Sequence, residues 1–264
     1  MSDAQYMEQP PHPCFPQPPN KNMSVWRYFE LWKFIDLLKT KRLFLSRADK
    51  LGDPHEGSIT RNQYVTLWRQ AVNAASIHDP DVLEILSPEH QAEYRRKLKV
   101  RVYVSCWHMN DSESEAMWRL YCGTKEGVAI RTTYEKLAQS VTDPNIYIGV
   151  IKYKDFEKEG FPLMQFDPNW PPQHVDFFPF MHKRKAFVHE SEVRIIRKFD
   201  KPQGKESETG IRIKWDLEEV IEEVYVNPYA QNGYLEVVKA VVQKFASGLE
   251  NTVQWSRMKS EPLY

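Results

Sequence analysis

The chain has 264 residues, enough for one large domain or two small ones, and either could bury a proper core. Lysine plus arginine equals aspartate plus glutamate at 36 each, so the sequence lacks the basic excess typical of nucleic-acid or membrane-surface binding. Three cysteines without CxxC spacing encode neither a disulfide framework nor a cysteine-type zinc site. Since no signal-peptide pattern and no membrane-length apolar run occurs, we expect a soluble cytoplasmic protein.

Residues 1–22 are rich in proline and poor in aliphatic side chains, which predicts a disordered tail before a single domain over 23–264. Apolar spacing predicts the first elements of that domain. They are a strand at 25–28, a helix around 31–38, a strand at 42–46 and a loop at 49–58.

Residues 59–100 are polar and lack turn signals in their middle, so we expect a helical insertion of two helices. Ser87 followed by Pro88 is typical of a helix N-cap and first turn. A strand is then predicted at 100–107, followed by an amphipathic helix whose cap is Ser112 or Ser114.

The second half of the chain mixes strands and helices without a strict βαβ rhythm. The predicted elements are strands at 126–133, 146–153, 191–199, 210–217, 221–228 and 252–258, and helices at 134–141, 181–190 and 233–246. The strand at 210–217 is the expected hairpin partner of the strand at 191–199. An aromatic, proline-rich connection over 155–180 is long enough to be a functional or covering loop. These elements predict the α+β class, with a mixed, mainly antiparallel sheet and packed helices.

The stretch "HESEVRII" is the strongest candidate for chemistry. If its strand begins near Glu190, then Glu190, Glu192 and Arg194 share one face, with neighbours about 7 Å apart. Arg194 could then keep one carboxylate ionised while the other accepts a proton, as a general base or an oxocarbenium-stabilising pair requires. The alternative is a solvated ion pair worth under about 1 kcal/mol.

The loop "GDPHEGS" places Asp53, His55 and Glu56 between two glycines. Such a set could bind a divalent metal, but no HxH or HExxH spacing supports a metal site. Asp-Pro also opens turns, and Glu56 could cap a following helix. We prefer a contact from this loop to a substrate, and assign no metal ligand.

Trp118 and Tyr121 lie three residues apart on one predicted helix face. They form either a stacking platform for a ligand ring or ordinary packing against the sheet, and the hydroxyl of Tyr121 makes it the better site candidate. Cys106 and His108 suggest a nucleophile and its base, although a buried free cysteine is the commoner outcome.

The run "HKRK" at 182–185 could steer a phosphate through Lys183, or form a solvated helix surface. Neither a GxGxxG nor a GxxxxGK[ST] motif occurs, so a nucleotide would have to bind in another way.

Several motifs together carry a resemblance to a known family. They are Trp26-Arg27-Tyr28, Asp53-Pro54-His55-Glu56, Ser105-Cys106-Trp107, Met117-Trp118 with Tyr121, Gly127-Val128-Ala129-Ile130, and Glu190-Ser191-Glu192 with Arg194. Over about residues 24–258 the chain resembles the mostly bacterial domain of unknown function two-nine-seven-one. It departs from that family's pattern at Gly52, where asparagine is usual, and at Trp107, where phenylalanine is usual.

The chain is more distantly similar to the ADP-ribosyltransferase fold. That resemblance implies that Arg27 and Tyr121 hold NAD, and that a late glutamate, Glu192 or Glu190, promotes attack on the ribose. NAD, a small nucleotide-like ligand, would then be a substrate, while the sequence does not identify a cofactor or a protein partner.

The leading hypothesis is therefore an enzyme that acts on a nucleotide or NAD-like ligand by glycosidic-bond transfer or hydrolysis, a chemistry that would suit phage defence. Glu192 and Glu190 are the catalytic candidates. The ligand-binding candidates are Arg27, Tyr28, Asp53, Glu56, Trp118, Tyr121, Lys183 and Arg194. The alternatives are a non-catalytic module that binds a nucleotide or a protein, and a metal-dependent nuclease that uses Asp53, Glu56 and Glu192.

Overall fold

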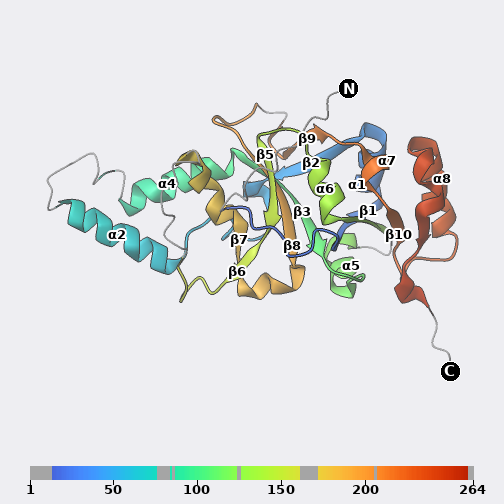
Figure 1. Ribbon diagram of the computed structural model, residues 1–264, viewed down its shortest axis with the longest axis horizontal. Coiled ribbons are helices and arrows are strands. Elements are labelled where there is room, and N and C mark those ends of the chain that lie inside the picture. The colour runs from blue at the N-terminus through green and yellow to red at the C-terminus, as the bar shows by residue number, and fades with distance from the viewer. Residues whose placement is uncertain are drawn as a thin grey trace.

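The computed structural model describes residues 14–75, 84, 87–123, 126–160, 172–204 and 207–260. A nine-stranded, mainly antiparallel sheet forms the centre of this part of the chain, and helices pack against it, which confirms the α+β class (Figure 1). None of the described helices combines the length and the apolar character that crossing a membrane requires.

The elements follow the sequence patterns closely in most places. The strands of the large sheet are β1 (Ser24–Glu30), β2 (Arg42–Arg47), β3 (Val102–Met109), β4 (Gly127–Thr133), β5 (Ile146–Val150), β8 (Glu192–Lys198), β9 (Gly210–Lys214), β10 (Glu223–Val226) and β11 (Val253–Trp255). A second, two-stranded parallel sheet consists of β6 (Lys152–Lys154) and β7 (His182–Arg184). The α-helices are α1 (Leu31–Thr40), α2 (Arg61–Ala75), α4 (Pro88–Lys99), α5 (Glu115–Cys122), α6 (Tyr134–Gln139), α7 (Leu217–Val220) and α8 (Tyr234–Phe245). Short 3-10 turns include η1 (Ala48–Lys50), η2 (Pro172–Met181), η3 (Lys185–Glu190), η5 (Ser247–Thr252) and η6 (Arg257–Lys259).

The sheet forks at β3. One edge of β3 pairs along its length with β8, from Val102↔Lys198 to His108↔Glu192. Strands β1 and β2 share the other edge of β3. Strand β1 pairs only with the C-terminal end of β3 (Trp26↔His108), and β2 pairs only with residues near its N-terminal end (Ser46↔Val104). Beyond these pairs β1 continues beside β4, and β2 beside β9. The strands β1 and β2 therefore diverge from β3 and leave a gap between them.

The main hydrophobic core lies between one face of the sheet and helices α1, α6 and α8. Helix α1 buries Phe34, Leu37 and Leu38, whose spacing of three and four residues gives it one apolar face. Val238 and Val242 repeat this pattern on α8. Because α1 connects β1 to β2, this packing also fixes how the two strands diverge.

Two smaller cores hold the other face. Helix α5 covers β1 and β4 through Met117 and Trp118, and Ser114 caps it by accepting a hydrogen bond from the Met117 N–H at 3.4 Å. The second small core includes Phe180 and Met181 from η2. Residues 161–171 of the expected covering loop lie outside the described residues.

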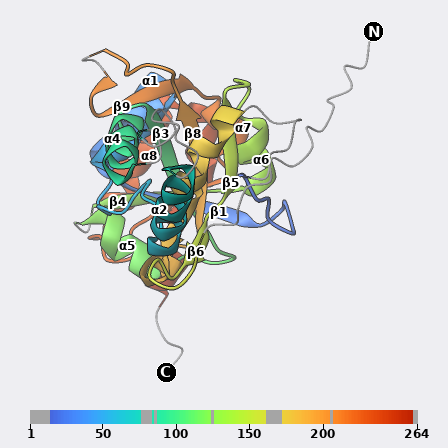
Figure 2. The same ribbon diagram turned by 90° about the vertical axis from the view of Figure 1, so that its left-hand side faces the viewer.

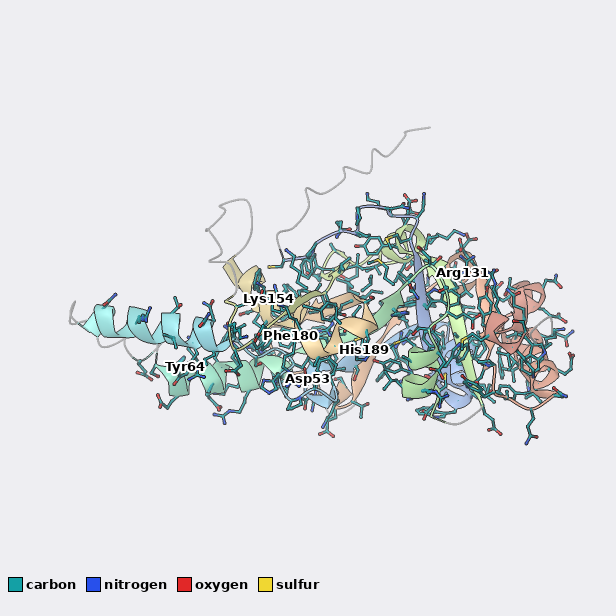
Figure 3. The ribbon with its side chains drawn as sticks, turned by 90° about the horizontal axis from the view of Figure 1, so that it is seen from below. Asp53, Tyr64, Arg131, Lys154, Phe180 and His189 are labelled. Atoms are coloured by element: carbon teal, nitrogen blue, oxygen red, sulfur yellow. The ribbon has the colours of Figure 1, made fainter. Side chains whose placement is uncertain are left out.

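The helical insertion predicted for 59–100 is present as α2 and α4, which pack together and extend from one end of the sheet (Figures 1 and 2). Ser87 caps α4 as expected, since its hydroxyl accepts from the His90 N–H at 3.2 Å. Tyr64, in the first turn of α2, lies on this extension, whereas Asp53, Phe180 and His189 lie in the central part of the molecule (Figure 3).

Part of the expected disordered tail, residues 14–22, is ordered in the structure. Cys14 and Phe15 are buried, and the Phe15 ring stacks on Tyr147 of β5 with 4.7 Å between centroids. The Pro16 carbonyl oxygen also accepts from the Val150 N–H at 2.8 Å. Two buried hydrophobic residues thus anchor a segment whose prolines suggested disorder, and residues 1–13 of the expected tail lie outside the described residues.

Two further expectations differ from the structure. The predicted helix at 181–190 is instead the strand β7 followed by η3. Strand β7 forms because it pairs with β6, a contact between distant segments that local sequence periodicity cannot predict. The strand β9 is not the hairpin partner of β8: it pairs with β2, while β8 lies between β3 and β5.

Candidate functional site

An open cleft runs across the fork of the sheet. Arg27 spans the gap, because its guanidinium donates to the Ser105 hydroxyl of β3 at 2.7 Å and to the Phe44 carbonyl oxygen of β2 at 3.2 Å. The cleft has a volume of about 940 Å³, which is in the range of small-molecule sites. Its walls come from β1, α1, β2, β3, α5, β8 and β9 and from the segments that precede α2 and β8.

Most residues that the sequence assigns to the site converge on this cleft. Eight of them line it: Arg27, Tyr28, Asp53, Glu56, Tyr121, Lys183, Glu190 and Glu192. Arg194 does not line the cleft: it is completely buried and contacts two of the lining carboxylates, those of Glu56 and Glu192. Trp118 lies elsewhere: it is 1% exposed, packs edge-to-face on Tyr28 and donates to Glu113 at 3.0 Å, so its ring belongs to the core.

Arg194 holds two glutamates from distant parts of the chain. Its Nε donates to Glu192 Oε1 at 2.6 Å, and its Nη1 to Glu56 Oε1 at 2.5 Å. Nη1 also contacts the Phe180 carbonyl oxygen at 2.5 Å. Glu56 and Glu192 are 3% and 2% exposed. The solvated ion pair considered from the sequence is therefore replaced by a buried network, in which each charge depends on the others.

Lys183 holds the second pair of carboxylates. Its ammonium forms an ion pair with Glu190 and lies 2.8 Å from Glu192 Oε2. The Tyr121 hydroxyl donates to Glu190 Oε1 at 3.3 Å. Lys183 is only 9% exposed, so it is a member of the site and not part of a solvated basic helix. With all five groups charged, the three glutamates (56, 190 and 192) and two cations carry a net charge of −1.

Burial and ion pairing push two of the carboxyl pKa values in opposite directions. For Glu192, burial opposes ionisation, but Arg194 and Lys183 outweigh it and lower the pKa to about 2. For Glu56, burial dominates over the attraction of Arg194, and the pKa is raised. Burial also acts on Lys183, yet Glu192 and the other acids nearby raise its pKa. Glu192 is therefore a permanent carboxylate at neutral pH, and Glu56 is the carboxyl that takes up a proton more readily.

Glu190 reaches the cluster by a route that strand alternation does not describe. The strand begins at Glu192, and Glu190 is the last residue of η3. Ser191 between them has a φ of 39°, in the left-handed region. This turn lets both carboxylates meet Lys183, while Arg194 contacts Glu192 and Glu56 instead of Glu190.

The loop before α2 contributes through ion pairs. The Asp53 carboxylate accepts from Arg184 Nη2 at 2.7 Å, and Glu56 is bound by Arg194. Within the described residues, no group of three His, Cys, Asp or Glu side chains is placed to hold a metal ion. The proposed nuclease set of Asp53, Glu56 and Glu192 would have to give up its arginine partners to coordinate one.

Cys106 and His108 do face the same side of β3, beside Glu192. Burial raises the pKa of the Cys106 thiol, which opposes thiolate formation. His108 is oriented by its Nδ1, which lies 2.6 Å from the Glu190 carbonyl oxygen, and burial lowers its pKa. A neutral thiol beside a neutral imidazole does not favour a thiolate nucleophile.

Sequence reasoning missed the aromatic wall of the cleft. Trp32 lines it and is 65% exposed, a large value for tryptophan. The signal was available, because Trp32 lies off the apolar face that Phe34, Leu37 and Leu38 define on the same helix.

His182, next to Lys183, provides a test of burial in this region. The residue is 4% exposed, Nδ1 lies 2.8 Å from the Phe178 carbonyl oxygen, and burial lowers the pKa of the imidazole from 6.5 to about 4. As the pH falls, the imidazole becomes protonated in the unfolded chain before it does so in the folded one. The contribution of His182 to the free energy of unfolding is therefore intact above pH 6.5 and is lost as the pH falls towards 4. We expect His182 to account for a loss of about 2 kcal/mol in the free energy of unfolding between pH 7.5 and 5.

Urea unfolding at these two pH values measures this loss. His182→Phe should reduce the pH-dependent loss, although its stability at pH 7.5 also falls because the ring nitrogen is gone. His108 contributes in the same direction, so some pH dependence remains. His90→Gln, at an exposed position on α4, is the control and should show the full loss. An equal loss in His182→Phe and the wild type would contradict the prediction.

Fold and site together define an α+β protein with a forked sheet, whose cleft lies over a buried network of glutamates, lysine and arginine. Over residues 117–195 the chain matches the model of a family described as protein of unknown function (DUF2971), which confirms the resemblance over that segment. Comparison with curated proteins and with solved structures gave no match. The matched segment contains Tyr121, Lys183, Glu190, Glu192 and Arg194, but not Arg27 or Glu56.

Proposed function

We propose that this protein is an enzyme that acts on a nucleotide or NAD-like ligand by transfer or hydrolysis at a glycosidic bond. The observation that carries the proposal is the convergence of Glu192, Glu190 and Arg27 on one cleft, with Glu192 kept ionised out of contact with bulk water.

Cleavage of a glycosidic bond places positive charge on the sugar as the bond breaks, and a fixed carboxylate stabilises this charge. With a pKa of about 2, Glu192 suits this electrostatic role better than that of a general base. Glu190 is the more accessible of the two, since its side chain is 12% exposed against 2% for Glu192. In the proposal Glu190 contacts the sugar directly, and Glu192, which lies deeper in the protein, stabilises the positive charge electrostatically.

The test is an incubation of the purified protein with NAD, followed by chromatography for released nicotinamide. We expect Glu192→Gln to lower turnover about 100-fold or more, because it removes a preorganised charge. Glu190→Gln should have an effect of similar size. Glu159→Gln is the matched control, since Glu159 pairs with Lys185 outside the cleft lining and should leave turnover unchanged.

Each variant is first checked for folding by its melting transition. The proposal fails if a folded Glu192→Gln protein changes neither the turnover of NAD nor its binding.

A second candidate function is a binding module without catalysis. The observation that favours it is that Lys183 and Arg194 already hold the carboxylates of the cleft in ion pairs. Thermal shifts against a panel of nucleotides separate the two functions: ligands would stabilise a binding module while no product forms.

A further inference from the structure

Arg27 is an unusual arginine in this molecule. Its guanidinium has neutral neighbours: Ser105 and the Phe44 carbonyl as hydrogen-bond acceptors, and the Phe29 and Trp107 rings at 5.2 and 5.7 Å. Among the described residues it forms no ion pair. Burial accordingly lowers its pKa to about 10. A partly buried cation without a counter-ion is costly, and an anion at this position would relieve that cost.

Three other arginines of the sheet show the contrast. Arg194 contacts two glutamates, and Arg212 pairs with Asp36 at 2.9 Å. Arg197 pairs with Asp143 at 2.8 Å. Arg27 differs from these in lining the cleft while lacking a carboxylate of its own.

Charge is distributed unevenly along the cleft walls. The acidic lining residues Glu56, Glu190 and Glu192 cluster around Lys183 and Arg194. The walls from β1, α1, β2 and β9 instead contribute the cations Arg27, Lys33, Arg42 and Arg212. Two acidic neighbours pair with this group: Glu30 with Lys33 at 2.8 Å, and Asp36 with Arg212 at 2.9 Å. A ligand that extends across the fork therefore meets a cationic region and a carboxylate region.

Trp32 lies on the cationic wall. Its Nε1 donates to Glu30 Oε2 at 2.9 Å, and the Lys33 ammonium lies 5.2 Å from its ring. These contacts hold the indole in place although it is 65% exposed. A fixed, exposed indole beside cations is a stacking surface for a planar ring that carries negative charge nearby.

We propose that the cleft takes a phosphorylated ligand with an aromatic base, with a phosphate against Arg27 and the base against Trp32. This deepens the proposed function, and it rests on that function only for placing the scissile sugar at Glu190 and Glu192. The ligand class is then a nucleoside diphosphate or its ribosylated derivative, bound in one direction across the fork.

The experiment measures equilibrium binding of ADP and of adenosine by isothermal titration calorimetry, without any turnover. Arg27→Gln should weaken ADP binding about 10- to 100-fold and leave adenosine binding unchanged, because only ADP carries the phosphates. Trp32→Ala should weaken both ligands by the same factor, about fivefold or more, and Trp32→Phe should recover much of this loss. Arg119→Gln, an exposed arginine outside the cleft lining, is the charge control and should bind both ligands as the wild type does.

Arg27 also bridges the fork, so Arg27→Gln could fail to fold. Two measurements avoid this difficulty. Trp32 is exposed, so its variants should fold normally. In the wild type, added salt should weaken the binding of ADP but not of adenosine.

The inference is overturned if the wild type binds neither ligand, if salt affects both equally, or if Trp32→Ala binds ADP as tightly as the wild type. The proposed function fails separately. If Trp32→Ala loses ADP binding but the wild type turns over no NAD, the proposed enzyme activity fails while the ligand assignment stands. If turnover depends on Glu192 while the Trp32 and Arg27 variants bind ADP as the wild type does, the proposed function stands and the ligand assignment fails.

Discussion

Replacing Arg194 with methionine is expected to lower the free energy of unfolding by about 3–5 kcal/mol. The side chain is completely buried and binds both Glu56 and Glu192, so its removal leaves two buried carboxylates without their common partner. Lys183 still contacts Glu192, but Glu56 keeps no other cation among its described ion pairs. Equilibrium unfolding in urea at pH 7 measures the effect.

A matched control lies on the same strand. Arg197 of β8 pairs with Asp143 at 2.8 Å, with both side chains partly exposed, at 23% and 34%. Arg197→Met should therefore cost under about 1 kcal/mol. Combining Arg194→Met with Glu56→Gln and Glu192→Gln should recover much of the loss, because no buried charge is then left unpaired. Equal costs for Arg194→Met and Arg197→Met would show that the buried network is not the cause.

The local elements of this fold were largely predictable, because they depend on patterns within a few residues. Ser87 caps its helix as its position before Pro88 indicates, and of the two cap candidates Ser112 and Ser114 the structure uses Ser114. The alternation in β3 and the helical spacing in α1 likewise gave these elements close to their observed bounds.

Pairing between distant strands could not be predicted in the same way. The strand β9 follows β8 in sequence, and proximity favoured a hairpin, yet β8 is occupied on both edges by β3 and β5. The strand β7 has three residues and exists through its pairing with β6, so its local sequence resembled a helix. Tertiary pairing decides both cases.

The site divides along the same line. Strand alternation predicts that Glu192 and Arg194 share a face, and their contact at 2.6 Å agrees. The contact between Arg194 and Glu56 spans 138 residues, and spacing alone contains no information about it. The same holds for Lys183, whose burial follows from β7 lying beneath the cleft and not from the basic run that surrounds it.

Gly57→Ala is expected to destabilise the protein by about 3 kcal/mol. Gly57 has a φ of 66°, which disfavours any residue with a Cβ. A Cβ at this position would also lie 2.3 Å from Cε1 of the Phe180 ring, so the ring or the loop must move. Both terms act on one backbone position, and the free energy of unfolding from urea titration measures their sum.

This substitution should also disturb the candidate site. Glu56 precedes Gly57, and the carbonyl oxygen of Phe180 accepts from Arg194, so a shift on either side alters the contacts of that guanidinium. The control is Gly52→Ala in the same loop, where a Cβ meets nothing within 4 Å and φ is not positive. Its stability should stay within about 0.5 kcal/mol of the wild type. If Gly57→Ala proved as stable as Gly52→Ala, the close approach of Phe180 to the loop would not determine where Glu56 lies, and the position of that carboxylate would need another cause.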